Sequence, residues 1–565
     1  MLSRRAAGWR VFLDCTTSFK REFFDLMRIV RKYQQQIDGL VCSGSRAAFF
    51  LAFALLVVVL AALGMLALKF GAPAANGRPW DTPMILDGAW RIANGQVPHR
   101  DFYNYIGDLP LYVTRLGMKL GRPCASAIDY GNVVLMAALI LPAMAALRRR
   151  TSALAAFLFS LFIGLLVITP RPLGDPYDYT DHAMLYNRHG EACIALLGAL
   201  LFLPPRPGFG GNRMNWWEAV LAGFLLTALL GCKLNYFAVG IGFFGVACIT
   251  GRFGPGRALA CVCAAAAFLA VALALSKIPL SDMLNDYRIM SGCQSLGTKI
   301  RVFAVQTIKG ILFLPVLLLL VWERFLGEAK TPPWRDILVI AAIFGCATFL
   351  LSSNTQVGEM PLLALAALYG AEMVLRQAVA PGETPFFNTV RRLGAFLLVL
   401  LFLLPSVATD LKTIRYTTYA AIKKRWDVPE SLQSTSLNDF RFVRDGTRRT
   451  DMQKYMGELD EGIQLLRRHA NPEMRLNAII FSNPFHVALG LRPASGGLIC
   501  LSASGLAQRS HPTLARLVGN ATHLLITHDS QILHETYGAE WDALHLQVVE
   551  ETKNYTLFKI PERAP

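Results

Sequence analysis

The chain has 565 residues, of which 54% are hydrophobic and 17% are charged, and its mean hydropathy is +0.40. Soluble globular proteins carry about a quarter charged residues, so this composition disfavours an ordinary soluble enzyme, and the abundance of apolar residues excludes intrinsic disorder. A net charge of +17 would point to nucleic acid in a soluble protein, but basic cytoplasmic loops explain it better in a membrane protein.

Residues 1–46 are basic and contain no long apolar run. The segment is too long and too charged for the start of a signal peptide, so we expect a cytoplasmic tail that is retained. Within it, Ser18–Tyr33 has a basic, amphipathic pattern. That pattern fits a helix lying on anionic lipid and a solvated tail equally well.

Residues 47–409 predict an all-α polytopic membrane domain, because about 20 predominantly apolar residues are enough to cross a bilayer. Eleven apolar runs follow one another along this part of the chain. The predicted spans are Ala47–Lys69, Ile128–Leu147, Ala153–Thr169, Ala192–Leu203, Ala219–Cys232, Tyr236–Thr250, Ala258–Leu275, Thr307–Val321, Ile337–Leu351, Pro361–Leu375 and Leu393–Ala408.

Alternate loops between these spans are rich in arginine, beginning with Arg148–Arg150 and ending with Arg391 and Arg392. The positive-inside rule assigns such loops to the cytoplasm. An odd number of spans from a cytoplasmic N-terminus then places residues 410–565 on the other side of the membrane.

The first outside loop, Gly71–Ser126, predicts two amphipathic helices. Thr82 is a suitable N-cap for a helix over Pro83–Asn94, and Gly95 suits its C-terminal cap. We expect this helix to lie at the membrane interface. A second helix is predicted over Leu109–Leu120.

Three acids in this loop are candidates for chemistry. Asp87 lies four residues before Arg91, which predicts a surface ion pair. Asp81 precedes the first helix, where the helix dipole favours an ionised carboxylate that can accept a proton, although a capping role fits as well. Asp101 is either a turn former or a second active-site acid.

The stretch Trp80–Tyr112, WDTPMILDGAWRIANGQVPHRDFYNYIGDLPLY, resembles the first periplasmic loop of bacterial GT-C glycosyltransferases. These are polytopic enzymes that use polyprenyl-phosphate sugars. Asp81 falls on the family's catalytic acid, and Arg100–Phe102 falls on its Arg-Asp-Phe block. Gly107–Pro110 departs from the usual Gly-Pro-Leu turn, which shifts the expected start of the second helix without affecting Asp81. The order of spans extends the resemblance along most of the chain.

The resemblance implies an inverting glycosyltransferase in a bacterial inner membrane, with its active site and C-terminal domain in the periplasm. Asp81 would take the proton from the acceptor hydroxyl. Asp101 would orient the acceptor or help to hold a divalent cation, Mg²⁺ or Mn²⁺. No residues are assigned as metal ligands, and the aspartates Asp175, Asp178 and Asp181 fit turn positions better.

A departing lipid phosphate needs cations on the outside face. Arg188 in the second outside loop and Lys233 in a turn between two spans are the candidates, and Lys233 with Tyr236 matches a pair common in the family. The alternatives are an interfacial anchor for Arg188 and snorkelling to the headgroups for Lys233. Arg288, Lys299 and Arg301 are further cations on this side.

Polar residues in the outside loops are expected to bind substrate. These are Arg100, Asn187, His189 and Glu359. Glu359 also fits a helix cap, and Asn354 and Gln356 lie near it in the sequence.

Residues 410–565 predict a soluble α/β domain. A helix is expected over Thr450–Ala470, and strands over Asn477–Phe481, His523–Thr527, Leu544–Val549 and Tyr555–Ile560, the last two forming a hairpin. No nucleotide-binding, metal-binding or nucleophile motif occurs in this domain.

The sequence therefore predicts transfer of a sugar from a polyprenyl phosphate to an envelope glycan, lipid or protein, with membrane lipid but no nucleic acid as a partner. The alternative is a transporter or flippase, which would place its ionisable residues within spans. A structural subunit that presents the C-terminal domain would leave the ordered first loop unexplained.

Overall fold

The computed structural model describes residues 46–70, 74–104, 106–206, 215–291, 296–311, 334–354, 359–375, 385–444, 449–499, 512–527 and 531–561. The predicted cytoplasmic tail, including Ser18–Tyr33, lies outside the described residues. The same holds for most of the predicted span Thr307–Val321 and for Gln356.

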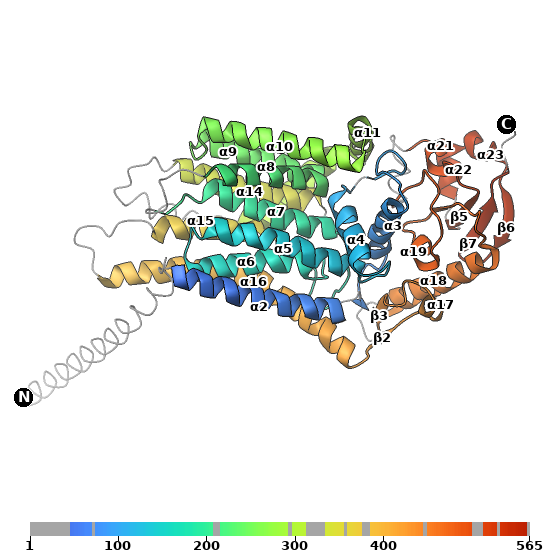
Figure 1. Ribbon diagram of the computed structural model, residues 1–565, viewed down its shortest axis with the longest axis horizontal. Helices are drawn as coiled ribbons and strands as arrows, with labels where there is room; N and C mark the ends of the chain where they lie inside the picture. The colour runs from blue at the N-terminus through green and yellow to red at the C-terminus, as the bar shows by residue number, and fades with distance from the viewer. Residues whose placement is uncertain are drawn as a thin grey trace, which may run out of the picture.

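Long apolar helices lie side by side along the long axis of the molecule (Figure 1). They are α2 (Arg46–Phe70), α5 (Ala127–Leu147), α6 (Ala153–Ile168), α7 (Leu185–Phe202), α8 (Trp216–Cys232), α9 (Leu234–Ile249), α10 (Pro255–Ser276), α14 (Trp334–Ser353), α15 (Leu362–Leu375) and α16 (Pro385–Ile422). Two further helices, α11 (Leu280–Ser291) and α12 (Leu296–Gly310), follow α10.

Each predicted span other than Thr307–Val321 falls on one of these helices. Within the described residues, α2, α5, α10, α14 and α16 are long and apolar enough to cross a membrane. The apolar helices α6, α8, α9 and α15 are shorter than that. The chain is therefore a multi-pass membrane protein, and the predicted count of eleven spans is not confirmed.

Helix α7 occupies the centre of the bundle, since every one of its residues is buried. It begins at Leu185, directly after Met184, which has a left-handed backbone with φ of 52°. The prediction that the second outside loop extends from Pro170 to Gly190 is wrong at its end, because neighbouring helices cover the polar residues Asn187, Arg188 and His189. They form the first turns of a fully buried helix.

The first outside loop forms the two predicted helices, α3 (Asp81–Ala93) and α4 (Leu109–Leu120). Gly95 has the expected left-handed backbone after α3, with φ of 84°. The N-cap is Trp80 rather than Thr82, which lies inside the first turn. The residues of α3 from Thr82 to Ala89 are buried by protein, and its predicted position at the membrane interface stays a prediction.

The C-terminal domain begins later than predicted, since α16 continues through Asp410 to Ile422. The prediction for Thr450–Ala470 is confirmed by α18 (Arg449–His469). The domain has a sheet of order β4-β5-β7-β6, in which β4 (Leu476–Ile479) and β5 (His523–Thr527) are parallel. The hairpin β6 (Gln547–Glu551) and β7 (Tyr555–Lys559) completes it. Short helices complete the domain: α17 (Glu430–Gln433), α19 (Phe485–Leu489), α21 (Leu514–Val518), α22 (Gln531–Tyr537) and α23 (Ala539–Asp542).

The first loop and the C-terminal domain share one hydrophobic core. Ile85 of α3, Leu111 of α4, Leu459 of α18 and Phe485 of α19 belong to the same buried cluster. Burying one such side chain contributes about 1.5–3 kcal/mol. A second sheet also joins the two parts, because β1 (Ala74–Ala75) pairs in parallel with β3 (Arg441–Val443), which pairs with β2 (Trp426–Asp427). The first outside loop is thus held between the helix bundle and the C-terminal domain (Figure 1).

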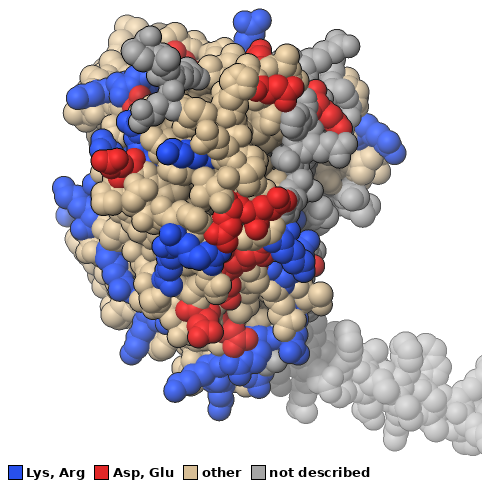
Figure 2. Space-filling view, turned by 90° about the vertical axis from the view of Figure 1, so that its right-hand side faces the viewer, with Lys and Arg blue, Asp and Glu red and all other residues tan. Residues whose placement is uncertain are grey.

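The opposite end of the bundle contains ion pairs between arginines of the predicted cytoplasmic loops and buried acids of the helices. Arg150 pairs with Glu218. Arg206 lies 3.1 Å from Glu372, and Arg252 lies 2.8 Å from Asp336. The exposed face of the C-terminal domain carries Lys and Arg interspersed with Asp and Glu instead (Figure 2).

Candidate active site

Asp81 is the first residue of α3 and is partly buried. Its Oδ2 accepts a hydrogen bond of 3.1 Å from the backbone N–H of Met184, which precedes α7. Burial raises the pKa of Asp81 to about 6, although the Met184 N–H and the nearby Arg78 oppose this shift. The expected effect of the helix N-terminus is therefore outweighed by desolvation, and Asp81 becomes a base whose pKa lies near neutrality.

A second acid lies beside Asp81, and it is Asp181 of the second outside loop. The Asp181 carboxylate accepts hydrogen bonds from the backbone N–H groups of Arg78, at 2.6 Å, and Ala183, at 2.8 Å. Burial raises the pKa of Asp181 to about 7, and the charge of Asp81 adds to the shift. The local sequence predicts only a turn at Asp181, since its proximity to Asp81 depends on the packing of two loops that are far apart in the chain.

Asp101 lies in the turn after α3. Its carboxylate accepts two hydrogen bonds from Arg100, at 2.7 and 2.9 Å, and one of 2.7 Å from the N–H of Val97. Arg100 is exposed. No hydrogen bond of the described residues joins Asp101 to Asp81, so the roles predicted for Asp101 and Arg100 stay predictions.

Asp87 is buried, although a surface ion pair is predicted for it. Its side chain is 0% exposed and that of Arg91 is 1% exposed, so their 2.9 Å ion pair is buried rather than at the surface. The other carboxylate oxygen lies 2.6 Å from Nδ1 of His486 in the C-terminal domain. His486 is 399 residues away from Asp87 in the sequence. The i,i+4 spacing of Asp87 and Arg91 therefore could not indicate this partner.

Lys233 occupies the turn between α8 and α9, as predicted. Its ammonium group donates a 2.8 Å hydrogen bond to Oδ1 of Asn354 and lies 5.0 Å from the ring centre of Tyr186. Among the described residues no carboxylate lies within ion-pair distance of Lys233. Its charge is balanced only by an amide and an aromatic ring, so it can still bind an anion.

The first turn of α7 links the acids to this cation. The N–H of Met184 binds Asp81, and the ring of Tyr186, two residues later, lies under Lys233. One short segment therefore contacts both a base and an unneutralised cation.

Tyr236 of α9 is buried beside Asn354, the residue that accepts the hydrogen bond from Lys233. Its hydroxyl lies 3.4 Å from Oε1 of Glu191 and 3.3 Å from Nδ2 of Asn354. The ring packs so closely on α7 that a Cβ atom at Gly190 would lie 2.7 Å from it. A glycine is required there for the close approach of the two helices.

Arg188, predicted to bind phosphate, is occupied by protein groups. Its guanidinium donates to the carbonyl oxygens of Leu165, Leu166 and Arg171 at 2.9–3.0 Å, and to Oδ2 of Asp410 at 2.7 Å. This geometry fits an anchor between α6, α7 and α16 better than an open anion site.

Glu359, predicted to bind substrate, belongs to the same network. It pairs with Arg171 at 2.8 Å and accepts a 2.6 Å hydrogen bond from Ser406. The side chain of Asn187 is buried, and neither its oxygen nor its nitrogen has a hydrogen-bond partner among the described residues. Nε2 of His189 lies 3.0 Å from Oδ1 of Asn132. Substrate contact by these three residues stays a prediction.

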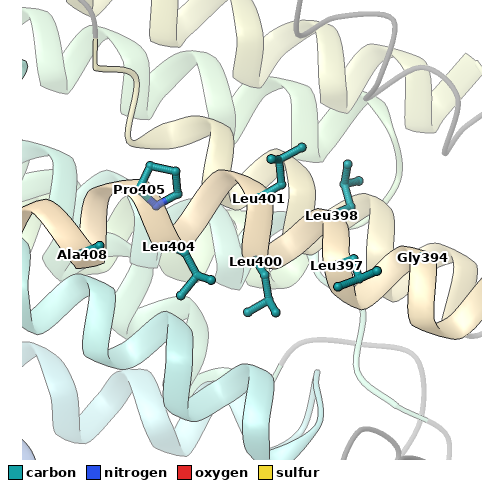
Figure 3. A pocket seen from close by; sticks show the side chains of 8 residues that line it. All are labelled: Gly394, Leu397, Leu398, Leu400, Leu401, Leu404, Pro405 and Ala408. Carbon is teal, nitrogen blue, oxygen red and sulfur yellow. The ribbon is translucent and has the colours of Figure 1, made fainter.

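An apolar groove of about 750 Å³ runs along α16 (Figure 3). Its lining comes from Gly394, Leu397, Leu398, Leu400, Leu401, Leu404, Pro405 and Ala408. Ser406 and Asp410, through which α16 contacts Glu359, Arg171 and Arg188, are buried and lie on the opposite face of α16 from this lining. The groove is thus an exposed apolar face of α16 that is separate from the polar network.

The described residues contain no group of three or more His, Cys, Asp or Glu side chains that could hold a metal ion. Asp81 and Asp181 together offer oxygen donors of the kind that Mg²⁺ binds, but a third protein ligand is not found with them in this part of the chain. The divalent cation stays a prediction.

No protein-family model matches the chain. No curated protein sequence matches it. Two solved structures of ArnT from Cupriavidus metallidurans are similar to it, one bound to undecaprenyl phosphate and one in the apo state. The first is 14% identical, covers 90% of this chain and 98% of the ArnT chain, and has a TM-score of 0.45. The second is 15% identical, covers 89% and 97%, and has a TM-score of 0.43.

Proposed function

We propose that the protein is a membrane glycosyltransferase that transfers a sugar from a polyprenyl phosphate to an acceptor hydroxyl. The observation that carries the proposal is the arrangement around the first turn of α7. A partly exposed base, Asp81, lies beside a second acid, and the same turn contacts Lys233, a cation for which the described residues provide no carboxylate partner. A base and a free cation are the two groups that displacement of a phosphate by a hydroxyl needs.

The reaction would proceed with inversion. Asp81 takes the proton of the acceptor hydroxyl as that oxygen attacks the anomeric carbon from one face of the sugar. The bond between the anomeric carbon and the phosphate oxygen breaks on the opposite face, and the polyprenyl phosphate leaves with the bonding electrons. A positioned general base contributes about 10²–10⁴-fold to the rate.

Lys233 would bind the lipid phosphate and offset the charge that grows on it as it leaves. The Asn354 amide and the Tyr186 ring hold the ammonium group in place without neutralising it. Arg188 would hold α7 against α6 and α16 rather than contact the phosphate, because its guanidinium already makes four hydrogen bonds to protein.

The polyprenyl chain would lie in the groove along α16. The lining is apolar over its whole length, and Leu397 and Leu401 are exposed. We propose the periplasmic face of a bacterial inner membrane as the location, and an envelope glycan, lipid or protein as the acceptor.

The test is release of free polyprenyl phosphate by the purified protein, given radiolabelled polyprenyl-phosphate sugars and an acceptor, with and without a metal chelator. A transporter or a structural subunit would release none. Asp81→Asn should lower the rate by at least about 10²-fold and leave donor binding intact, because the amide keeps the shape but accepts no proton.

Asp427→Asn is the matched control for this substitution. Asp427 forms an exposed ion pair of 2.7 Å with Arg444 in the C-terminal domain, and its loss should leave turnover unchanged. Normal turnover by the Asp81 variant would contradict the mechanism.

A further inference from the structure

Three side chains form a buried cluster where α3 meets the C-terminal domain. Asp87 and Arg91 come from α3, and His486 comes from α19. We call Asp87, Arg91 and His486 the α3 latch. None of the three contacts the acids Asp81 and Asp181 in any hydrogen bond of the described residues.

The α3 latch is hydrogen-bonded on all sides. Asp87 lies 2.9 Å from Nε of Arg91 and 2.6 Å from Nδ1 of His486, whose Nε2 lies 2.9 Å from the carbonyl oxygen of Leu476 in β4. A charged group buried this deeply persists only when its partners satisfy it.

Arg91 extends the α3 latch across the C-terminal domain. It donates to the carbonyl oxygens of Ala494, at 3.1 Å, and Gly496, at 2.9 Å, and to Oδ1 of Asn477, at 3.1 Å. The guanidinium also lies 5.5 Å from the ring centre of Phe102. Ion pairing within α3 would not need these contacts, so the cluster binds the helix to the domain.

The same helix carries Asp81 at its first residue. Asp87 follows six residues later, about 9 Å along the helix at 1.5 Å per residue. The N-terminal end is also covered, since the ring of Trp80 lies 5.9 Å from that of Tyr455 in α18 and 6.3 Å from that of Phe481. A rigid helix held at both places transmits the position of the C-terminal domain to Asp81.

We infer that the α3 latch is a positioning element through which the C-terminal domain sets the place of Asp81 in the active site. The inference rests on the proposed role of Asp81 as the base. It gives the C-terminal domain a part in catalysis, and it makes Asp87, Arg91 and His486 positioning residues that do not touch substrate.

The experiment compares Asp87→Asn and His486→Gln with wild type and with Asp427→Asn, all as full-length purified protein. Hydrogen–deuterium exchange of the α3 backbone amides should be at least about tenfold faster in the two latch variants, with α5 and α6 unchanged, because local opening becomes easier. Exchange in Asp427→Asn should match the wild type, since its ion pair is exposed.

Transfer kinetics provide the second measurement. The kcat of the latch variants should fall by up to about 10²-fold, as expected when a reacting group is misplaced by about 1 Å, and the KM for the donor should change by less than about twofold. The pH at which activity is lost in acid should also fall, because a displaced Asp81 is more hydrated. A loss of folded enzyme alone would leave the KM and the pH dependence of the remaining activity unchanged.

Unchanged α3 exchange in both variants would overturn the inference, and so would an unchanged pH dependence together with normal kcat per folded molecule. If these variants do not fold, Arg91→Lys retains the charge and should give a smaller increase in α3 exchange. If the wild type transfers no sugar from any donor, the proposed function fails, whereas the exchange experiment still decides whether the α3 latch holds the helix.

Discussion

The surroundings of Asp81 and Lys233 favour their proposed roles in different ways. Asp81 is desolvated at a helix N-terminus, so its pKa is about 6 and it is a stronger base than an exposed aspartate while still ionised at neutral pH. Lys233 is held by an amide oxygen and an aromatic ring, which leave its positive charge available. The basicity of Asp81 is thus raised by burial, whereas the charge of Lys233 is not neutralised by a carboxylate of the described residues.

The pKa of Asp81 predicts the acid side of the pH profile. A protonated carboxyl cannot accept the acceptor's proton, so kcat/KM should fall about tenfold per pH unit below about pH 6 and level off above it. Initial rates at saturating acceptor, measured in overlapping buffers, provide the check. A flat profile between about pH 5 and about pH 8 would mean that another group is the base.

Removing the charge of Lys233 should affect the donor specifically. A hydrogen bond to a charged group contributes roughly 1.5–3 kcal/mol, so Lys233→Met should lower kcat/KM for the polyprenyl-phosphate sugar by about tenfold to hundredfold. Thermal stability should be unchanged or raised, because a charge in an apolar setting is lost. Lys233→Arg, which keeps the charge, should retain more activity. Full activity of the Met variant at all donor concentrations would show that Lys233 is an interfacial anchor.

At the scale of the helices, the site depends on the close packing of α7 against α9. Gly190 permits this contact, since any side chain there would meet the ring of Tyr236. The position of the Tyr236 hydroxyl near Glu191 and Asn354 follows from the same packing.

Gly190→Ala should therefore destabilise the protein and weaken donor use together. The added methyl group would lie 2.7 Å from the Tyr236 ring, and such overpacking typically costs about 1–3 kcal/mol. Gly242 of α9 is the matched control, because a Cβ there has no neighbour within 4 Å. Gly242→Ala should be neutral or stabilising in thermal unfolding. Equal melting temperatures for the two variants would contradict this account of the packing.

The elements that the sequence predicted well depend on local signals. Pro83, Gly95 and an apolar face were enough to predict α3 within two residues at its start, and α4 matches its predicted range. The burial of Asp87 and the bonding of Arg188 depend on His486 and Asp410, which are 399 and 222 residues away in the sequence. Local pattern cannot reveal such partners, so the sequence predicts the helices but assigns the Asp87–Arg91 pair to the surface and Arg188 to phosphate binding.

At the scale of the molecule, the two ends of the helix bundle differ in the residues and elements that they carry. One end has arginine loops tied to helix ends by buried ion pairs, such as Arg150 with Glu218. The other end has α3, α4 and the C-terminal domain (Figure 1). This polarity agrees with basic loops in the cytoplasm and the candidate site outside.

The polarity predicts the location of the C-terminus. A reporter that is active only in the periplasm, fused after Pro565, should be active in cells. The matched fusion in the arginine loop after Arg150 should be inactive. The reverse result would place both the C-terminal domain and Asp81 in the cytoplasm.

The pairing of β1 with β3 also constrains when the protein can become active. Ala74 and Ala75 are among the first residues to leave the first predicted span, whereas their partners Arg441 and Phe442 are made after the last one. The loop that carries Asp81 must therefore wait through the synthesis of the whole bundle before its sheet and its core can form. Assembly of the site becomes the final step of biogenesis, so a chain whose synthesis stops within the bundle would lack a completed site.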